Sequence, residues 1–110
     1  MRPTRAGRMR HRLTLERDMG GDDGHGGQLR DWQTVREFWG FVRPLRGTEQ
    51  LEADRLEASV THRIHCRFMS DIDPRDRIVF RGRPFNIRQI IDVEEWRREL
   101  DILCEEGVAT

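Results

Sequence analysis

The chain has 110 residues, enough for one domain with a modest core, because a small chain buries a smaller fraction of its surface. Hydrophobic residues make up 35% and charged residues 36% of the sequence, and no apolar run approaches the about 20 residues that a transmembrane helix needs. The formal net charge is zero, which argues against a dedicated DNA-binding domain. We expect a soluble, cytoplasmic protein of one domain over residues 1–110, with no secretion signal and no membrane segment.

Residue types restrict the possible chemistry further. All the basic residues are arginines, which excludes a P-loop lysine and a Schiff-base lysine. The two serines, Ser59 and Ser70, do not lie in a nucleophile elbow. Two cysteines, Cys66 and Cys104, are too few for a disulfide framework and are expected to be buried thiols. We therefore predict that the protein is not an enzyme and needs no cofactor.

The N-terminal part predicts an arm, a strand and a loop. Residues 1–10 are rich in arginine and form a predicted flexible arm. Over residues 11–17, Leu13 and Leu15 alternate with polar side chains, which is the period-2 pattern of a half-buried strand. Residues 18–28 contain several glycines, so we predict a mobile hairpin loop there rather than a packed element.

The next segment predicts a second strand and a long crossover. Residues 32–45 are rich in aromatic and branched side chains, and the strand should end at Pro44, which lacks a backbone donor. Large apolar side chains fall on both faces, so we expect this strand to be partly covered on two sides. Residues 45–59 then form a predicted projecting crossover, with Thr48 capping a short helix or ordered loop over 49–58.

The C-terminal half predicts four further strands. Residues 60–69 alternate strictly, with Ile64 and Cys66 among the inward positions. A hairpin follows, in which residues 77–80 and 85–91 are paired strands and Gly82 supplies the turn. Residues 97–106 form the last strand. The prediction is a mostly β fold: a small antiparallel β-barrel of about six strands that removes its own edges by closure, with one long crossover loop.

Two segments resemble ion sites only superficially. In "HRIHC", His62 and Cys66 lie four residues apart on a strand, roughly 13 Å, and His65 points to the opposite face, so they cannot share one zinc ion. "GGDDGHGG" lacks the EF-hand spacing and the lysine of a phosphate-binding loop. We predict no metal site in either segment.

Arginines dominate the charged features, and each group has two interpretations. In "RIVFRGRPFNIRQII", Arg81 and Arg83 flank the hairpin turn, either as a solvated rim or as part of a nucleic-acid-binding ribbon over 77–88. The arm is either a solubilising tail or a segment that orders on an acidic partner. The arginines of this predicted partner interface are Arg2, Arg5, Arg8, Arg10 and Arg12.

The order of segments carries a resemblance over essentially the whole chain. "RHRLTLER", "VREFWGFVRPLRGTE", "ASVTHRIHCRF", "VFRGRPFNI" and "RRELDILCEE" follow one another as in the head-tail joining, or head closure (stopper), proteins of long-tailed bacteriophages and gene transfer agents. The sequence resembles that family in the order and spacing of these short segments, rather than in any one of them.

The resemblance implies a structural protein of the virion neck, assembled in the bacterial cytoplasm. It implies a homo-oligomeric ring of six or twelve copies that closes the portal channel after DNA packaging. Its partners would be a portal-side adaptor and a tail terminator protein, with packaged duplex DNA nearby. The crossover would face the channel through Arg46, Glu49, Glu52, Asp54, Arg55 and Glu57. The alternative is a small β-barrel that binds nucleic acid through the arm and the 77–88 hairpin.

Overall fold

The fold consists of six antiparallel strands. The computed structural model describes residues 9–21, 24–27, 29–47 and 60–107. The strands are β1 (His11–Asp18), β2 (Trp32–Pro44), β3 (His62–Arg67), β4 (Arg77–Phe80), β5 (Arg83–Asp92) and β6 (Glu99–Glu106), with a 3-10 turn, η2 (Val93–Glu95), before β6. Each strand lies where the sequence pattern places one, and the ends differ by at most two residues.

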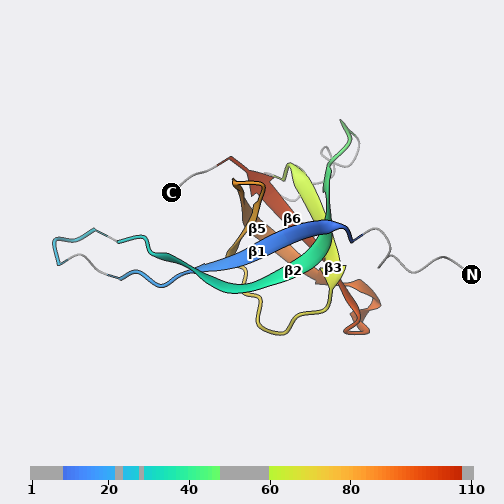
Figure 1. Ribbon diagram of the computed structural model, residues 1–110, viewed down its shortest axis with the longest axis horizontal. Helices are drawn as coiled ribbons and strands as arrows, with labels where there is room; N and C mark the ends of the chain where they lie inside the picture. The colour runs from blue at the N-terminus through green and yellow to red at the C-terminus, as the bar shows by residue number, and fades with distance from the viewer. Residues whose placement is uncertain (1–8, 22–23, 28, 48–59, 108–110) are drawn as a thin grey trace, which may run out of the picture.

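These strands close into a barrel with the order β1-β2-β3-β6-β5-β4, as Figure 1 shows. Closure depends on two pairings between segments far apart in the sequence. β1 pairs with β4, where Leu15 lies opposite Ile78, and β3 pairs with β6, where Ile64 lies opposite Ile102. The predicted antiparallel barrel is confirmed, and within the described residues no helix is long and apolar enough to cross a membrane.

One continuous core fills the barrel, and it follows the alternation of the strands. Leu13 and Leu15 of β1 are completely buried, as are Ile64 and Cys66 of β3. The core also contains Phe80 and Phe85 from the β4–β5 hairpin, as predicted. Both cysteines are free thiols without exposed surface, which confirms the prediction for them.

The outer face of β2 is covered in part, as expected, but not at Trp39. Phe38 and Val42 point into the core. On the other face Phe41 is half-buried and contacts the ring of His11, whereas Trp39 is 53% exposed. Trp39 is open because the six strands bury their inner faces against one another in a closed barrel, and among the described residues no second layer covers this part of the outer face.

Gly40 allows β2 to pass closely between its neighbours. It lies opposite His11 of β1 and Cys66 of β3. A Cβ atom at this position would lie 2.8 Å from Leu13 Cδ1 and 3.0 Å from the His65 carbonyl oxygen. Glycine, which has no Cβ atom, therefore allows the three strands to approach this closely.

A two-residue turn joins β4 to β5. Arg81 (φ 53°) and Gly82 (φ 75°) both have positive φ, which matches the twist of a two-residue hairpin. Because the turn takes only these two residues, β5 begins at Arg83, two residues earlier than predicted. Pro84 lies inside this strand, opposite Val79.

The β1–β2 hairpin continues beyond the barrel. The Met19 amide donates to the Asp31 carbonyl (2.8 Å) and the Leu29 amide to the Gly21 carbonyl (2.7 Å). Asp18 braces the base, since its Oδ1 accepts the amides of Gly20 (2.9 Å) and Asp31 (3.0 Å). These bonds lower the pKa of the Asp18 carboxyl to about 2. We call residues 18–31 the β1–β2 extension. The two backbone hydrogen bonds join its two sides, but among its described residues no strand lies between Asp18 and Trp32, and residues 24–26 form a bend. Figure 1 shows the extension projecting away from the barrel.

Both ends of the crossover meet at one point of the barrel. The Leu45 amide donates to the Thr61 carbonyl (2.9 Å), and the Thr61 amide donates to the Cys104 carbonyl (2.9 Å). Leu45 and Val60 pack together against Leu103 in a small second cluster. The predicted helix over 49–58 lies outside the described residues.

Candidate functional site

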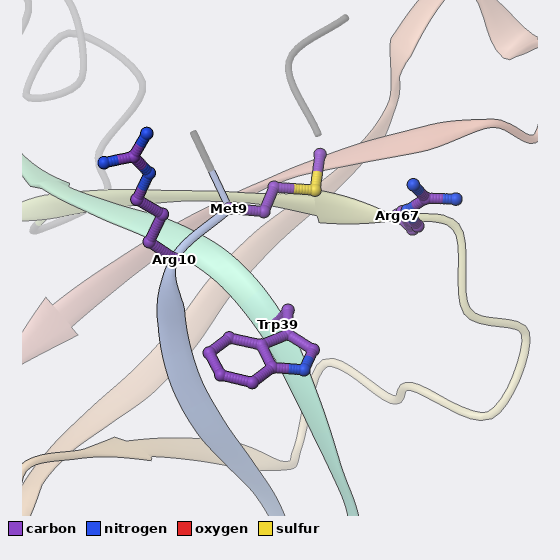
Figure 2. Close-up of a pocket in the computed structure, with 4 residues that line it drawn as sticks. All are labelled: Met9, Arg10, Trp39 and Arg67. Atoms are coloured by element: carbon purple, nitrogen blue, oxygen red, sulfur yellow. The ribbon is translucent and has the colours of Figure 1, made fainter. Parts of the chain in front are cut away.

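The most distinctive surface feature among the described residues is a shallow depression of about 460 Å³ beside Trp39. Met9, Arg10, Trp39 and Arg67 line it, as Figure 2 shows. The lining comes from the residues before β1, the outer face of β2 and the end of β3. We call it the Trp39 depression.

Its chemistry combines an exposed indole with positive charge. The Arg12 guanidinium lies over the Trp39 ring, 5.1 Å from the ring centre, and forms an ion pair with Glu37 (3.6 Å). Met9 is buried, whereas Arg67 is exposed and has no ion pair within the part of the chain that the structure describes. Exposed aromatic rings flanked by arginines are enriched in protein interfaces, so this surface is suited to bind another macromolecule.

The structure places only part of the predicted arm. Arg10 lines the Trp39 depression and Arg12 stacks on its indole, so these two predicted partner residues are close together. Arg2, Arg5 and Arg8 lie outside the described residues. Met9, predicted as part of the arm, is only 8% exposed and packs against the barrel end.

The crossover residues are likewise only partly placed. Arg46 is exposed, two residues after the end of β2. The other residues predicted to face the channel lie outside the described residues; they are Glu49, Glu52, Asp54, Arg55 and Glu57.

The β4–β5 hairpin does not present a row of free arginines. Arg83 forms a bidentate ion pair with Glu106 (2.6 and 2.7 Å), and Arg88 pairs with Glu105. Arg77 pairs with Glu16 (2.8 Å) and stacks over Trp32. Arg81 lies over the ring of Phe80, 4.8 Å from its centre. These partners favour the solvated-rim interpretation, because a nucleic-acid ribbon needs arginines available for phosphate.

A charged cluster joins β3 to β6 on the outside of the barrel. His65 Nδ1 lies 2.6 Å from Asp101 Oδ1, and Nε2 lies 2.7 Å from Glu99 Oε2. The hydrogen bond that His65 donates to Asp101, together with the negative charge of both carboxylates, raises the pKa of His65 above its usual value. Two acidic side chains of β6 are thus paired with a basic side chain of β3.

This cluster predicts a pH-dependent contribution to stability. Because the folded-state pKa of His65 is raised, the imidazolium stabilises the barrel fully below its unfolded pKa of 6.5, and this contribution disappears as the pH rises through the folded value. The difference in unfolding free energy between wild type and His65→Gln should therefore shrink from pH 5.5 to pH 9 in urea denaturation. A difference that stays constant over this range would contradict the role of the cluster.

The described residues contain no group of three or more His, Cys, Asp or Glu side chains placed to hold a metal ion. His62 and Cys66, both in "HRIHC", serve packing instead. The His62 ring lies edge-on to Phe85 (4.9 Å), and burial lowers its pKa. Burial raises the pKa of both Cys66 and Cys104 to about 12, so neither thiol is an activated nucleophile.

Sequence reasoning missed the Trp39 depression. It brings together Met9, Trp39 and Arg67, which are far apart in the chain and lie in three separate segments. The available signal was the outward position of Trp39 in a single-layer barrel, but the sequence pattern did not show whether a second layer covers β2.

Two solved structures are similar to this chain over nearly its whole length. The chain is similar to a Shigella flexneri 2a protein with a structure determined in solution, at 30% identity and a TM-score of 0.74, with 94% of this chain and 97% of that chain covered. It is also similar to a chain from the virion of a native gene transfer agent particle, at 25% identity and a TM-score of 0.64, with 98% of this chain and 100% of that chain covered. Curated proteins give no match.

The sequence family that matches is that of phage head completion proteins, over residues 4–107. This range includes every strand of the barrel. Its members are structural proteins of virions, in keeping with the similarity to a virion chain. The chain therefore belongs to the phage head completion protein family.

Proposed function

We propose that the protein forms a homo-oligomeric ring of six or twelve copies at the junction of head and tail. There it closes the portal channel after DNA packaging and provides the surface on which the tail docks. The observation that carries this proposal is family membership over residues 4–107, together with the full-length similarity to a chain of a gene transfer agent virion. Its partners in the neck are a portal-side adaptor and a tail terminator protein.

The anchoring of the crossover supports a channel-facing role for it. Leu45 and Val60 fix both of its ends at the same point of the barrel. Residues 44–60 contain four acids against two arginines. A negative surface lets duplex DNA pass without binding, because binding requires cations at the phosphates.

Neutralising the crossover acids tests this charge effect. The variant replaces Glu49, Glu52 and Glu57 by glutamine and Asp54 by asparagine. Genome ejection from assembled particles should slow, since DNA then interacts more favourably with the channel wall. Ejection rates measured by fluorescence of released DNA would contradict the proposal if they equalled those of wild-type particles.

The arm supplies the positive surface for an acidic partner. Arginine forms bidentate pairs with carboxylates, which suits an arm that orders on the portal-side adaptor. Arg10 and Arg12 already lie at the Trp39 depression, and the remaining arginines of the arm precede them in the sequence.

Co-sedimentation tests the proposed function. Purified protein is mixed with DNA-filled, tailless heads or with naked duplex DNA, at low and at moderate salt. We expect sedimentation with heads and none with naked DNA. Salt-sensitive sedimentation with naked DNA alone would instead establish the nucleic-acid-binding alternative, because such binding falls steeply as salt rises.

A further inference from the structure

The connection between β5 and β6 has an unusual backbone. Glu94 (φ 59°), Glu95 (φ 57°) and Arg97 (φ 54°) all lie in the left-handed region, which is unfavourable for any residue that has a Cβ atom. The Asp92 carboxylate holds this conformation by accepting the Arg97 amide (3.0 Å). We call residues 91–98 the β5–β6 corner. A corner that is fixed in shape in advance binds a partner at a lower entropic cost.

This corner presents an exposed tryptophan. Trp96 is 64% exposed and Ile91 is 36% exposed, so the corner holds two of the five large hydrophobic residues that are exposed in the described part of the chain. The Arg98 guanidinium lies over the Trp96 ring, 5.5 Å from its centre. A third exposed hydrophobic residue is Trp39, in the Trp39 depression. Tryptophan and arginine are the residue types that most often carry the binding energy of an interface.

The corner also carries unpaired acids. Glu94 and Glu95 are exposed, and they are the only acidic residues of the described ranges for which the structure shows no hydrogen bond or ion pair. The Trp39 depression has the opposite charge, because Arg67 is exposed without an ion pair in the described ranges and Arg12 lies over the indole. Arg97 is exposed in the corner as well. Opposite charges therefore meet only if the two acids, rather than Arg97, face the arginines of the depression.

The corner and the depression face different directions at one level of the barrel. In the closed order β1-β2-β3-β6-β5-β4, β5 lies three strands from β2 in either direction, so the outer faces of these two strands are on opposite sides. Arg67 at the end of β3 pairs with Glu99 at the start of β6, which places the depression and the corner at the same height. Figure 1 shows the corner at the end of the barrel away from the β1–β2 extension. Both indoles are exposed, so a copy does not cover its depression with its own corner.

We infer that the β5–β6 corner of one copy docks in the Trp39 depression of the next, with Trp96 against Trp39 and with the two acids of the corner facing Arg67. This inference rests on the proposed ring and identifies its subunit contact. The contact is head-to-tail, because a corner meets a depression rather than a second corner. Head-to-tail contacts produce closed rings when the rotation between neighbours closes, and two surfaces at the same height favour a flat ring over a filament.

Thiol cross-linking of head-bound protein tests the contact. One variant contains Glu37→Cys, two residues from Trp39 on the same face of β2, and another contains Arg97→Cys, next to Trp96; both positions are exposed. These substitutions leave both indoles and the facing charges in place, and the two native cysteines are buried. With a short bismaleimide linker, the mixture of variants should give cross-linked dimers, and each variant alone should give none.

Charge reversal tests the orientation of the contact. Glu94→Arg with Glu95→Arg in the Arg97→Cys chain should lower the yield of mixed dimers about tenfold or more, because like charges then face one another. Arg67→Glu in the Glu37→Cys chain should lower the yield in the same way. Mixing the two reversed chains should restore the yield, which a misfolded chain could not do.

Exposed side chains elsewhere supply the matched controls. Trp96→Ala in the Arg97→Cys chain should abolish the mixed dimer, whereas Leu29→Ala, at a side chain that is 57% exposed, should preserve it. Arg75→Cys, exposed on the 71–76 turn, should not cross-link to Arg97→Cys. Head-bound protein without mixed dimers, or with no recovery when both reversed chains are mixed, would overturn the inference alone. Failure of wild-type protein to bind heads would overturn the proposed function instead.

Discussion

Phe85→Ala is expected to lower the free energy of unfolding by about 3–5 kcal/mol. The Phe85 side chain has no exposed surface and lies in the barrel core, with its ring against that of His62. The strand that carries it pairs with both β4 and β6, so neither neighbour can move inward without disturbing the closed barrel. The deletion therefore leaves a cavity as well as removing apolar contacts.

Urea denaturation followed by tryptophan fluorescence measures this loss. Trp96→Ala is the matched control, because it removes a larger ring that is 64% exposed and should change stability by no more than about 0.5 kcal/mol. Equal losses for the two variants would contradict the assignment of Phe85 to the core. Because small domains are stable by only about 5–15 kcal/mol, the Phe85→Ala protein should be close to unfolding.

Asp76→Ala is expected to lower the free energy of unfolding by about 2–3 kcal/mol. The Asp76 side chain is 1% exposed and accepts hydrogen bonds from Arg17 Nε (2.8 Å), Arg17 Nη2 (2.9 Å) and the Asp73 amide (3.0 Å). Arg17 also donates to the Asp71 carbonyl (2.7 Å), so this pair fastens the 71–76 turn to β1. The substitution leaves the Arg17 guanidinium without its carboxylate, but water reaches that group and limits the loss.

Asp71→Ala provides the comparison for this pair. Its carboxylate is 42% exposed and bonds to Arg36 (3.2 Å), which is a surface ion pair worth no more than about 1 kcal/mol. The contact from Arg17 to the Asp71 backbone remains in this variant. Thermal denaturation of both variants should show the larger decrease in Tm for Asp76→Ala, and the reverse order would contradict the importance of the buried carboxylate.

The strands could be predicted because each strand of the barrel buries one face and exposes the other, which gives its sequence a period of two. Leu13 and Leu15 in β1, and Ile64 and Cys66 in β3, alternate with polar residues, and that alternation is a local signal. The β4–β5 turn was equally local, since Gly82 marks it. Residue types at fixed spacing were therefore sufficient for strand positions.

Strand order and charge pairing could not be predicted in the same way. The β1–β4 and β3–β6 pairings join segments that are distant in sequence, and no local pattern specifies them. Arg83 and Glu106 become partners through the register of β5 against β6, which no local pattern specifies either. The arginines of the β4–β5 hairpin could therefore be proposed as a rim from sequence. The ion pairs that they form with acids of β1 and β6 could not, because these pairs depend on which strands become neighbours.

Part of the candidate site also depends on tertiary structure. Arg10 and Arg12 were proposed as interface residues from the charge of the arm alone. Their place beside Trp39 follows from the outer face of β2 being uncovered, and Arg67 joins them from β3.

We propose that the protein completes the head as a ring at the portal vertex. Cryo-electron microscopy of DNA-filled, tailless heads incubated with the purified protein tests it most directly, with untreated heads for comparison. We expect additional density for a closed ring of six-stranded barrels at the single portal vertex, with the crossovers directed to its axis. Density spread over the capsid surface, or a portal vertex unchanged by the protein, would contradict it.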